Sequence, residues 1–281
     1  MIYIPDDVLD RMISEDVPYC DLTTWALDIG EQQGRMEYYS RQQAVLCGIE
    51  EAGRILEKLG VRVIDSMRSG QTVQPGEVFL RAEGPAGAIH MAWKVTQNLM
   101  ECCSGIATKT RRIVDIVKAV EPRAAVVSTR KSLPGVKQIS VKAIMAGGAF
   151  PHRLGLSETL LVFEQHMNFV GGFDSFLERI ASVKAKLPEK KLLVETSSLE
   201  CALRLAEAGV DALQFDKLTP SELRMSVAEL KASHPRLVLL AAGGIDEHNA
   251  AEYAAAGVDA LVTTSLFFAR PMDMSVRITA L

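Results

Sequence analysis

Hydrophobic and polar positions follow a regular pattern in the second half of the chain. From residue 124 onward, short runs rich in apolar residues recur: AAVVSTR, TLLVF, KLLVETS, DALQFDK, LVLLAAGG and DALVTTS, which begin at residues 124, 159, 191, 211, 237 and 259. Polar side chains or glycines stand at or just after the end of each run. Most of the segments between them have helical spacing, as in SLECALRLAEAG. Because strands that alternate with helices form parallel sheets, the pattern predicts an α/β domain with six parallel strands.

A repeated hexapeptide favours a barrel for these units. AGVDAL occurs at 208–213 and again at 256–261, each time where a helix is expected to end at glycine and a strand to begin. Such repetition is typical of stacked βα units, and six units would make an open α/β barrel. A doubly wound sheet is the alternative. Both folds bind ligands at the carboxyl ends of the strands.

The first 110 residues have a mixed pattern. RMEYYSRQQAVLCG and VRVIDSM alternate as strands do, and IEEAGRILEKLG between them is an amphipathic helix that ends at glycine. QTVQPGEVFLRAEG contains a Pro–Gly turn between extended segments, and a long helical pattern follows over about 85–119. We predict a small α+β domain over 1–110.

Composition excludes several classes of function. The chain has 281 residues and a formal net charge of −4, so it lacks the basic surface that nucleic acid requires. Its five cysteines have no metal-binding spacing, which fits a reducing compartment. The acidic start MIYIPDDVLDRM is no signal peptide, and no apolar run is long enough to span a membrane. We therefore expect a cytoplasmic protein that binds neither nucleic acid nor membrane.

Basic residues gather where the first two strand runs place their ends. Arg130 and Lys131 follow the first run, and His152 and Arg153 precede the second. Guanidinium groups bind carboxylate or phosphate oxygens two at a time. Ordinary pairing with surface carboxylates is the alternative for any single cation. Because four such groups converge on one barrel mouth, we predict an anion site there.

Later strand ends carry glycines and carboxylates. Gly243 and Gly244 follow the fifth run, where backbone N–H groups at a turn can bind phosphate; a plain turn is the alternative. The next residues are expected to start a helix with Asp246 as its N-cap. Asp216 and Glu195 end two other runs, and each could bind ribose hydroxyls or Mg²⁺, or serve as a cap or ion-pair partner.

Several motifs resemble the quinolinate phosphoribosyltransferase family, also called nicotinate-nucleotide pyrophosphorylase (carboxylating). They are NLMECCSGIATKT at 98–110, STRKSLPGVK at 128–137 and GGAFPHRLGLSETLLVFEQH at 147–166. PDDVLDRMISEDVPYCDLTT near the start and LLAAGGIDEHNAAEYAAAGVDALVTTSL near the end extend the resemblance over almost the whole chain. Within the family, the chain is most similar to a subgroup associated with molybdenum transport loci.

The resemblance implies an architecture and a reaction. It implies an N-terminal α+β sandwich domain that the C-terminal segment 270–281 joins, and an open six-stranded α/β barrel of the type II phosphoribosyltransferases over 111–269. It also implies a homodimer, or a larger assembly built from it, in which the partner's N-terminal domain completes each active site. The family reaction joins quinolinate to phosphoribosyl pyrophosphate with Mg²⁺, which gives nicotinate mononucleotide, pyrophosphate and CO₂.

The resemblance also implies roles for individual residues. Small anionic substrates would be bound by Lys94 from the partner and by Arg130, His152, Arg153 and Phe163; the catalytic residues would be Lys131, Glu195 and Asp216, with Asp216 also a Mg²⁺ ligand; and phosphate would be bound by Gly243, Gly244 and Thr264. The chain departs from the family at Lys94, where an arginine is expected, at Phe163, where a lysine is expected, and at Leu193, Ala241, Ala242 and Thr264. These departures predict a phosphoribosyltransferase-type site with an altered acceptor.

Two alternatives to that function remain from the sequence. The barrel could hold an oxyanion or a cofactor intermediate without turnover, which the apolar replacements favour. A Schiff-base aldolase that uses Lys131 or Lys217 is weaker, because nothing in the sequence indicates that either lysine is buried among apolar residues.

Overall fold

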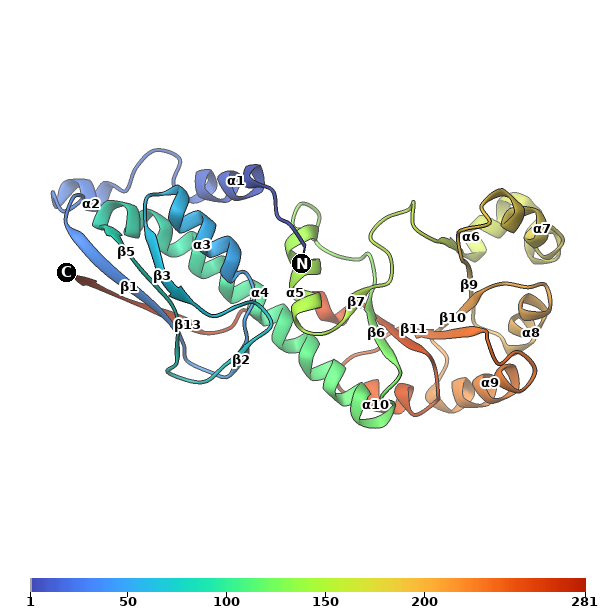
Figure 1. Ribbon diagram of the computed structural model, residues 1–281. Coiled ribbons are helices and arrows are strands. Elements are labelled where there is room, and N and C mark those ends of the chain that lie inside the picture. Colours follow the sequence, from blue (N-terminus) through green and yellow to red (C-terminus); the bar gives the residue numbers. More distant parts are fainter. Residues whose placement is uncertain (1) are drawn as a thin grey trace. The chain divides into compact units, whose positions relative to one another are not determined.

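The computed structural model describes residues 2–281, and the chain divides into two compact units (Figure 1). The first unit comprises the residues up to Arg111, the segment 133–148 and the C-terminal residues 267–281. The second comprises 112–132 and 149–266. The first unit thus contains a segment, 133–148, that follows the first strand of the predicted barrel.

The first unit is built on an antiparallel sheet of four strands in the order β13-β1-β5-β3. These strands are β1 (Gln33–Ser40), β3 (Arg62–Ser66), β5 (Val78–Pro85) and β13 (Met274–Ala280). Two short strands pair beside them, β2 (Ala44–Val45) and β4 (Thr72–Val73). The helices are α1 (Asp6–Asp16), α2 (Leu22–Ala26), α3 (Ile49–Lys58), α5 (Lys137–Ala146) and the first part of α4 (Ala86–Val120). This is the predicted α+β sandwich.

Helices α3 and α4 cover this sheet because each presents an apolar face to it. Ile49, Ala52 and Leu56 of α3 recur at helical spacing and are almost completely buried. They share one core with Met36 and Tyr38 of β1. Over residues 2–281, no helix is both long and apolar enough to cross a membrane.

The second unit contains a parallel sheet in the order β7-β6-β12-β11-β10-β9-β8. Its strands are β6 (Ala125–Ser128), β7 (Phe150–Pro151), β8 (Leu160–Val162), β9 (Leu192–Thr196), β10 (Ala212–Asp216), β11 (Val238–Ala242) and β12 (Ala260–Thr263). The consecutive strands β7 and β8 form the two edges, so the barrel is open between them. The predicted α/β barrel fold is confirmed. The sheet has one strand more than expected, since β7 spans only two residues and has no apolar run.

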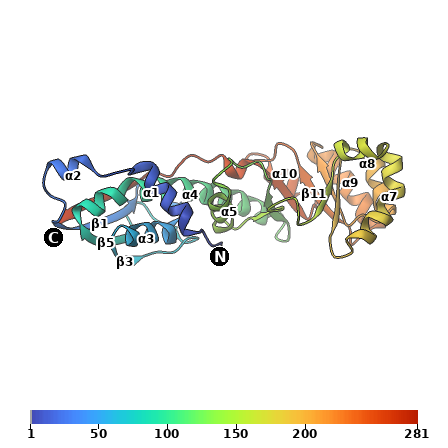
Figure 2. The same ribbon diagram turned by 90° about the horizontal axis from the view of Figure 1, so that it is seen from above.

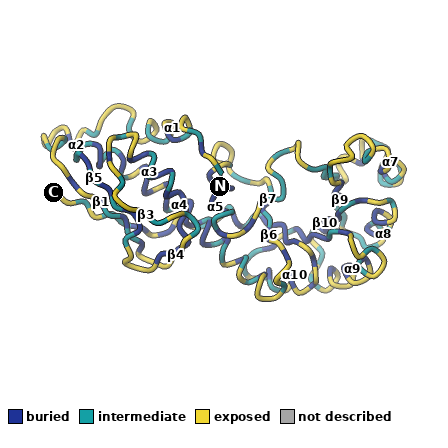
Figure 3. The backbone as a smooth tube through the Cα atoms, in the orientation of Figure 1, coloured by how far each residue is buried: buried dark blue, intermediate teal, exposed yellow. Residues whose placement is uncertain are grey.

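Helices cover the outer side of this barrel. They are α6 (Glu164–Met167), α7 (Gly172–Lys186), α8 (Leu199–Glu207), α9 (Pro220–Ser233) and α10 (Ala250–Ala254). A 3₁₀ segment, Asn168–Val170, lies between α6 and α7, and another, Ser265–Phe267, follows β12. Figure 1 shows α7, α8 and α9 one after another beside β9, β10 and β11, and Figure 2 shows the same three helices next to one another. Figure 3 shows buried strands and exposed outer helix surfaces. Side chains alternate along each strand, and Leu193, Leu240, Ala242 and Val262 therefore meet inside the barrel.

Candidate active site

One cavity of about 860 Å³ opens at the carboxyl ends of the barrel strands. Residues at the ends of all seven strands line it: Thr129, Arg130 and Lys131 after β6, His152 and Arg153 after β7, Leu161 and Phe163 at β8, Glu195 on β9, Gln214, Asp216 and Lys217 at β10, Ala242, Gly243, Gly244, Ile245 and Asp246 after β11, and Val262, Thr263, Thr264 and Ser265 at β12; Gln165 completes the lining. A parallel sheet brings its strand ends to one edge, which explains this convergence.

Three cations of the cavity have no acidic partners in the described part of the chain. Arg130, Lys131 and Arg153 make no ion pair with any carboxylate of residues 2–281. Burial lowers the pKa of Arg153, and the positive charge of Arg130 lowers it further. Burial and the neighbouring Arg153 likewise lower the pKa of His152. This side of the cavity therefore carries positive charge that a bound anion would neutralise.

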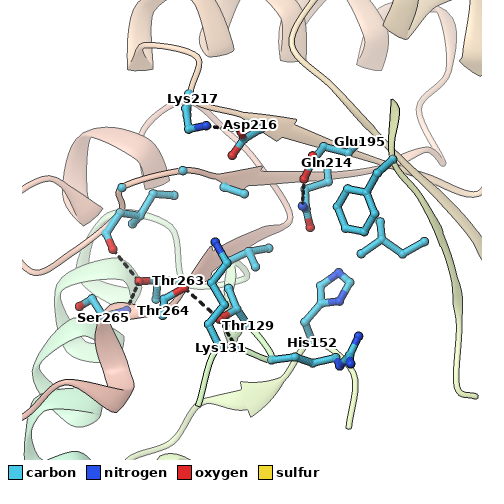
Figure 4. Close-up of a pocket in the computed structure, with 18 of the residues that line it drawn as sticks. Thr129, Lys131, His152, Glu195, Gln214, Asp216, Lys217, Thr263, Thr264 and Ser265 are labelled. Carbon is cyan, nitrogen blue, oxygen red and sulfur yellow. Dashed lines mark hydrogen bonds and ion pairs between the residues drawn. The ribbon is translucent and has the colours of Figure 1, made fainter. Parts of the chain in front are cut away.

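Two carboxylates lie on adjacent strands of the same cavity. Glu195 of β9 accepts a hydrogen bond of 2.7 Å from the amide of Gln214 on β10, and the two residues are paired in the sheet (Figure 4). Burial raises the pKa of Glu195, and the charge of Asp216 adds to the shift. Asp216 pairs with Lys217 at 3.1 Å. Asp216 therefore both lines the cavity and has the ion-pair partner that the sequence offered as an alternative role.

The Gly243–Gly244 turn closes tightly on the end of β10. Gly243 has φ +97°, and a Cβ there would lie 2.6 Å from the backbone nitrogen of Lys217. Gly244 has φ +71°. Successive N–H groups in such a turn form a concave site for anions. Only glycine fits at position 243, so the turn is a specific feature of this site.

The predicted helix start after these glycines is wrong. Helix α10 begins only at Ala250, with Asn249 at its N-cap. Asp246 instead stabilises a turn: its carboxylate accepts a hydrogen bond of 2.8 Å from the His248 N–H. A side-chain hydrogen bond from Asn249 to the Gly244 carbonyl, at 3.0 Å, holds the same turn. Any phosphate here would bind to the glycine turn and not to the end of a helix.

Hydroxyl groups at the ends of β6 and β12 also line the cavity. Thr129 and Thr264 hydrogen-bond to each other at 2.9 Å, which joins the ends of β6 and β12. Thr263 donates to the Ile245 carbonyl at 2.5 Å and accepts from the Ser265 N–H at 3.0 Å (Figure 4). The Ser265 Oγ is buried and has no hydrogen-bond partner among the described residues. Because buried hydroxyls normally have partners, Ser265 is free to donate to a ligand.

Lys94 is the one predicted site residue that does not line the cavity. It lies on α4 in the first unit, 4.6 Å from the centre of the Trp93 ring and 3.5 Å from the side-chain oxygen of Gln97. The other ten predicted residues all line it. Of the departures from the family, Phe163, Ala242 and Thr264 line the cavity, whereas Leu193 and Ala241 do not.

Gln214 is a cavity residue that the sequence reasoning missed. It is buried and holds Glu195 in place. Its signal was available in DALQFDK, because Gln214 lies two residues before Asp216 and so shares its face of the strand. Figure 4 shows Lys131, His152 and the Gln214–Glu195 pair, which come from different strands, around one space.

Comparison with known proteins agrees with this fold. Residues 21–104 match the N-terminal domain of quinolinate phosphoribosyl transferase, and residues 106–277 match its C-terminal domain. The chain is 40% identical over 251 residues to "Putative pyrophosphorylase ModD" of Rhodobacter capsulatus, which covers 89% of this chain and 96% of the relative. It is 31% identical over 281 residues to "Probable nicotinate-nucleotide pyrophosphorylase [carboxylating]" of Methanothermobacter thermautotrophicus, which covers 98% and 99%.

A solved structure supports the same assignment. The crystal structure of NadC from Streptococcus pyogenes superposes with a TM-score of 0.90 at 25% identity, over 98% of this chain and 96% of that one. Both halves of the chain match one family, and the matches to relatives run almost from end to end. The chain therefore belongs to the quinolinate phosphoribosyl transferase family.

Proposed function

We propose that this chain is a phosphoribosyltransferase-type pyrophosphorylase. It would transfer the phosphoribosyl group of phosphoribosyl pyrophosphate to an acidic acceptor and release pyrophosphate. One observation carries the proposal: three cations without acidic partners face two carboxylates across a single cavity that also contains a glycine turn. A donor with phosphates at both ends of a ribose needs this combination of groups.

Each group has a place in the reaction. The N–H groups of Gly243 and Gly244 would bind the 5′-phosphate, with the Ser265 hydroxyl as a further donor. Lys131 would neutralise the departing pyrophosphate. Charge develops at the ribose C1 as its bond to pyrophosphate breaks, so catalysis would consist mainly of positioning and electrostatic stabilisation.

The carboxylates fit a Mg²⁺ ion that arrives with the donor. Within residues 2–281, no group of three or more His, Cys, Asp or Glu side chains could hold a metal ion by itself. Glu195 and Asp216 nevertheless supply two oxygen ligands on adjacent strands. Mg²⁺ typically binds one or two carboxylates together with substrate phosphates, and when bound it would neutralise phosphate charge. Asp216 is the primary ligand in this proposal.

The acceptor would be held by its acid group and by an apolar wall. Arg130, His152 and Arg153 would bind the acid. Phe163 and Ala242 form apolar parts of the lining, and the family resemblance implies a lysine in place of Phe163. Quinolinate has two adjacent carboxylates, so the loss of a cation from the site should weaken the binding of quinolinate in particular. We expect an acid other than quinolinate to be preferred, and CO₂ release only with a quinolinate-like acceptor.

The proposal includes a homodimer whose partner supplies Lys94. In support, the first unit, which contains Lys94, exposes the apolar side chains Tyr19, Leu22, Trp25 and Leu27 on α2 and its neighbours. Large exposed apolar patches commonly mark interfaces. Mixing subunits that carry Lys94→Ala with subunits that carry Lys131→Ala tests this arrangement. Mixed dimers would contain one intact site and recover activity, whereas a site built within one chain would stay inactive.

A panel assay tests the activity. Pyrophosphate release is measured with phosphoribosyl pyrophosphate, Mg²⁺ and quinolinate, nicotinate or a broad set of other carboxylic acids. We expect acceptor-dependent release that Lys131→Gln abolishes. Arg224→Gln serves as the control, because Arg224 is an exposed cation of α9 outside the cavity. Tight binding of donor and acid without any release would reject the enzyme and leave a binding protein.

A further inference from the structure

A second cavity adjoins the first along β8, the edge strand of the open barrel. It has a volume of about 590 Å³ and lies entirely within the second unit. Arg130, Arg153, Leu161 and Phe163 line both cavities, so the two meet at these four side chains. These four side chains, Phe163 among them, form the common boundary of the two cavities.

The far wall of the second cavity is one face of α7. Phe176, Arg179, Val183 and Lys186 line it and recur at helical spacing, so their side chains share that face. His166 also lines the cavity, and its ring stacks on Phe163 with centroids 5.7 Å apart and planes 20° apart. The lining contains no aspartate or glutamate. The second cavity therefore combines aromatic and aliphatic surface with positive charge.

Arg179 and Lys186 are exposed side chains of α7, and they differ from Lys184 of the same helix in having no carboxylate partner in the part of the chain that the structure describes. Lys184 lies outside the second cavity and pairs with Asp211 at 2.8 Å. Arg179 and Lys186 line the cavity and make no ion pair with any carboxylate of residues 2–281. The Thr159 Oγ1 at the same cavity is buried and has no hydrogen-bond partner among the described residues. Three polar groups thus remain available to one ligand.

We propose that the second cavity is a subsite for the far end of the acceptor. The acceptor would be an elongated dianion: an acid group at Arg130 and Arg153, a flat apolar body beside Phe163, and a second anionic group, carboxylate or phosphate, at Arg179 and Lys186. The identification of this ligand as the acceptor rests on the proposed function, whereas the subsite itself is inferred from the lining of the second cavity. It gives the replacement of a family lysine by Phe163 a purpose, since a ring permits an apolar body to pass between the two charged ends.

Calorimetry with probes of defined length tests the subsite. The two-ended probes are 4-carboxyphenyl phosphate and its biphenyl analogue, and the one-ended probes are benzoate and phenyl phosphate, each titrated into the full chain. We expect one of the two-ended probes to bind about tenfold or more tightly than either one-ended probe, because a second charged group gains its own hydrogen bonds. If neither two-ended probe exceeds the one-ended probes, the subsite is refuted.

Paired variants locate the second charge. In Arg179→Gln/Lys186→Gln, we expect the gain of the two-ended probe to disappear while benzoate binds as before. Arg224→Gln/Arg236→Gln is the charge-matched control, because both arginines are exposed, unpaired within the described residues and outside both cavities. An unchanged two-ended affinity in the α7 variant, or an equal loss in the control, would overturn the assignment.

The same variants separate this inference from the proposed function. Pyrophosphate release with the compact acids quinolinate and nicotinate, and binding of phosphoribosyl pyrophosphate, are measured independently of the probes. Donor binding retained in Arg179→Gln/Lys186→Gln supports a subsite confined to the acceptor. If the wild-type chain binds the two-ended probe through α7 but releases no pyrophosphate with any acid, the proposed function fails and the subsite stands. If pyrophosphate is released with the compact acids but the two-ended probes bind no more tightly than the one-ended probes, the subsite is refuted and the proposed function stands.

Discussion

Replacing Gly243 by alanine adds a methyl group where the backbone leaves no room for one. The new Cβ would lie 2.6 Å from the Lys217 nitrogen and 2.9 Å from the Asp216 Oδ1. The residue also has φ +97°, where a side chain costs about 1–2 kcal/mol. Relieving the overlap requires a shift of the β10 end, and such backbone strain costs about 1–3 kcal/mol. We therefore predict that Gly243→Ala lowers the free energy of unfolding of the second unit by about 2–5 kcal/mol.

Gly244→Ala is the matched control for this prediction. Gly244 also has positive φ, +71°, but an added Cβ would meet no atom within 4 Å. Its cost should be the conformational one alone, about 1–2 kcal/mol. The difference between the two alanine variants thus isolates the contact with Lys217 and Asp216.

The measurement must report on the second unit. Both tryptophans, Trp25 and Trp93, lie in the first unit, so their fluorescence does not follow this barrel. Hydrogen exchange of peptides from β10 and β11 does, because opening of these paired strands exposes their amides. Equal exchange rates in Gly243→Ala and Gly244→Ala would refute the reasoning, because the turn would then accommodate a Cβ at position 243 without moving the end of β10.

Three further predictions concern the charged groups of the cavity. Arg153→Gln should weaken benzoate binding about 10–100-fold by calorimetry while Arg224→Gln leaves it unchanged, because Arg153 lines the cavity and has no carboxylate partner among residues 2–281. Equal losses in the two variants would contradict a role of Arg153 in binding the acid group. The pKa of Glu195 is raised above 4.5, so this group contributes stability that is present below pH 4.5 and is lost as the pH rises through the raised pKa. In urea unfolding, the stability of Glu195→Gln relative to wild type should therefore be greater at about pH 8 than at about pH 4. A difference between the two proteins that does not change with pH would contradict this. The pKa of His152 is lowered below 6.5, so its contribution to stability is complete above pH 6.5 and is lost as the pH falls through the lowered pKa. Between about pH 7.5 and 5.5, His152→Asn should therefore lose less stability than wild type. Equal losses in the two proteins would contradict this contribution of His152.

Strand positions and cavity residues could be predicted because a parallel sheet leaves two direct signals. Its buried strands are continuous apolar runs, and its polar residues follow those runs, as Asp216 and Glu195 do. Gln214 was missed, although the same alternation places it on the strand face of Asp216. The periodicity therefore predicts which residues form the inner face of the barrel and at which edge of the sheet the candidate site lies.

Other features depend on contacts that no local pattern records. β7 is a strand only because Phe150 and Pro151 pair with Val127 and Ser128 of β6. Helix α5 follows the first barrel strand in sequence, but its Ile139 and Ala143 pack with Val95 and Leu99 of α4. The late start of α10 results from the hydrogen bonds of Asp246 and Asn249. Each of these depends on a partner distant in sequence or on a particular turn geometry.

The most direct test of the central claim is a ³¹P NMR time course with phosphoribosyl pyrophosphate, Mg²⁺ and an acidic acceptor. Our account predicts that donor signals disappear as those of pyrophosphate and a ribose 5-phosphate product appear, only when acceptor is present. It also predicts that with Lys131→Gln the donor signals persist throughout the time course, whereas Arg224→Gln converts the donor as wild type does. A spectrum that stays constant with every acid of the panel, two-ended acids included, would contradict the claim that this cavity transfers phosphoribosyl groups.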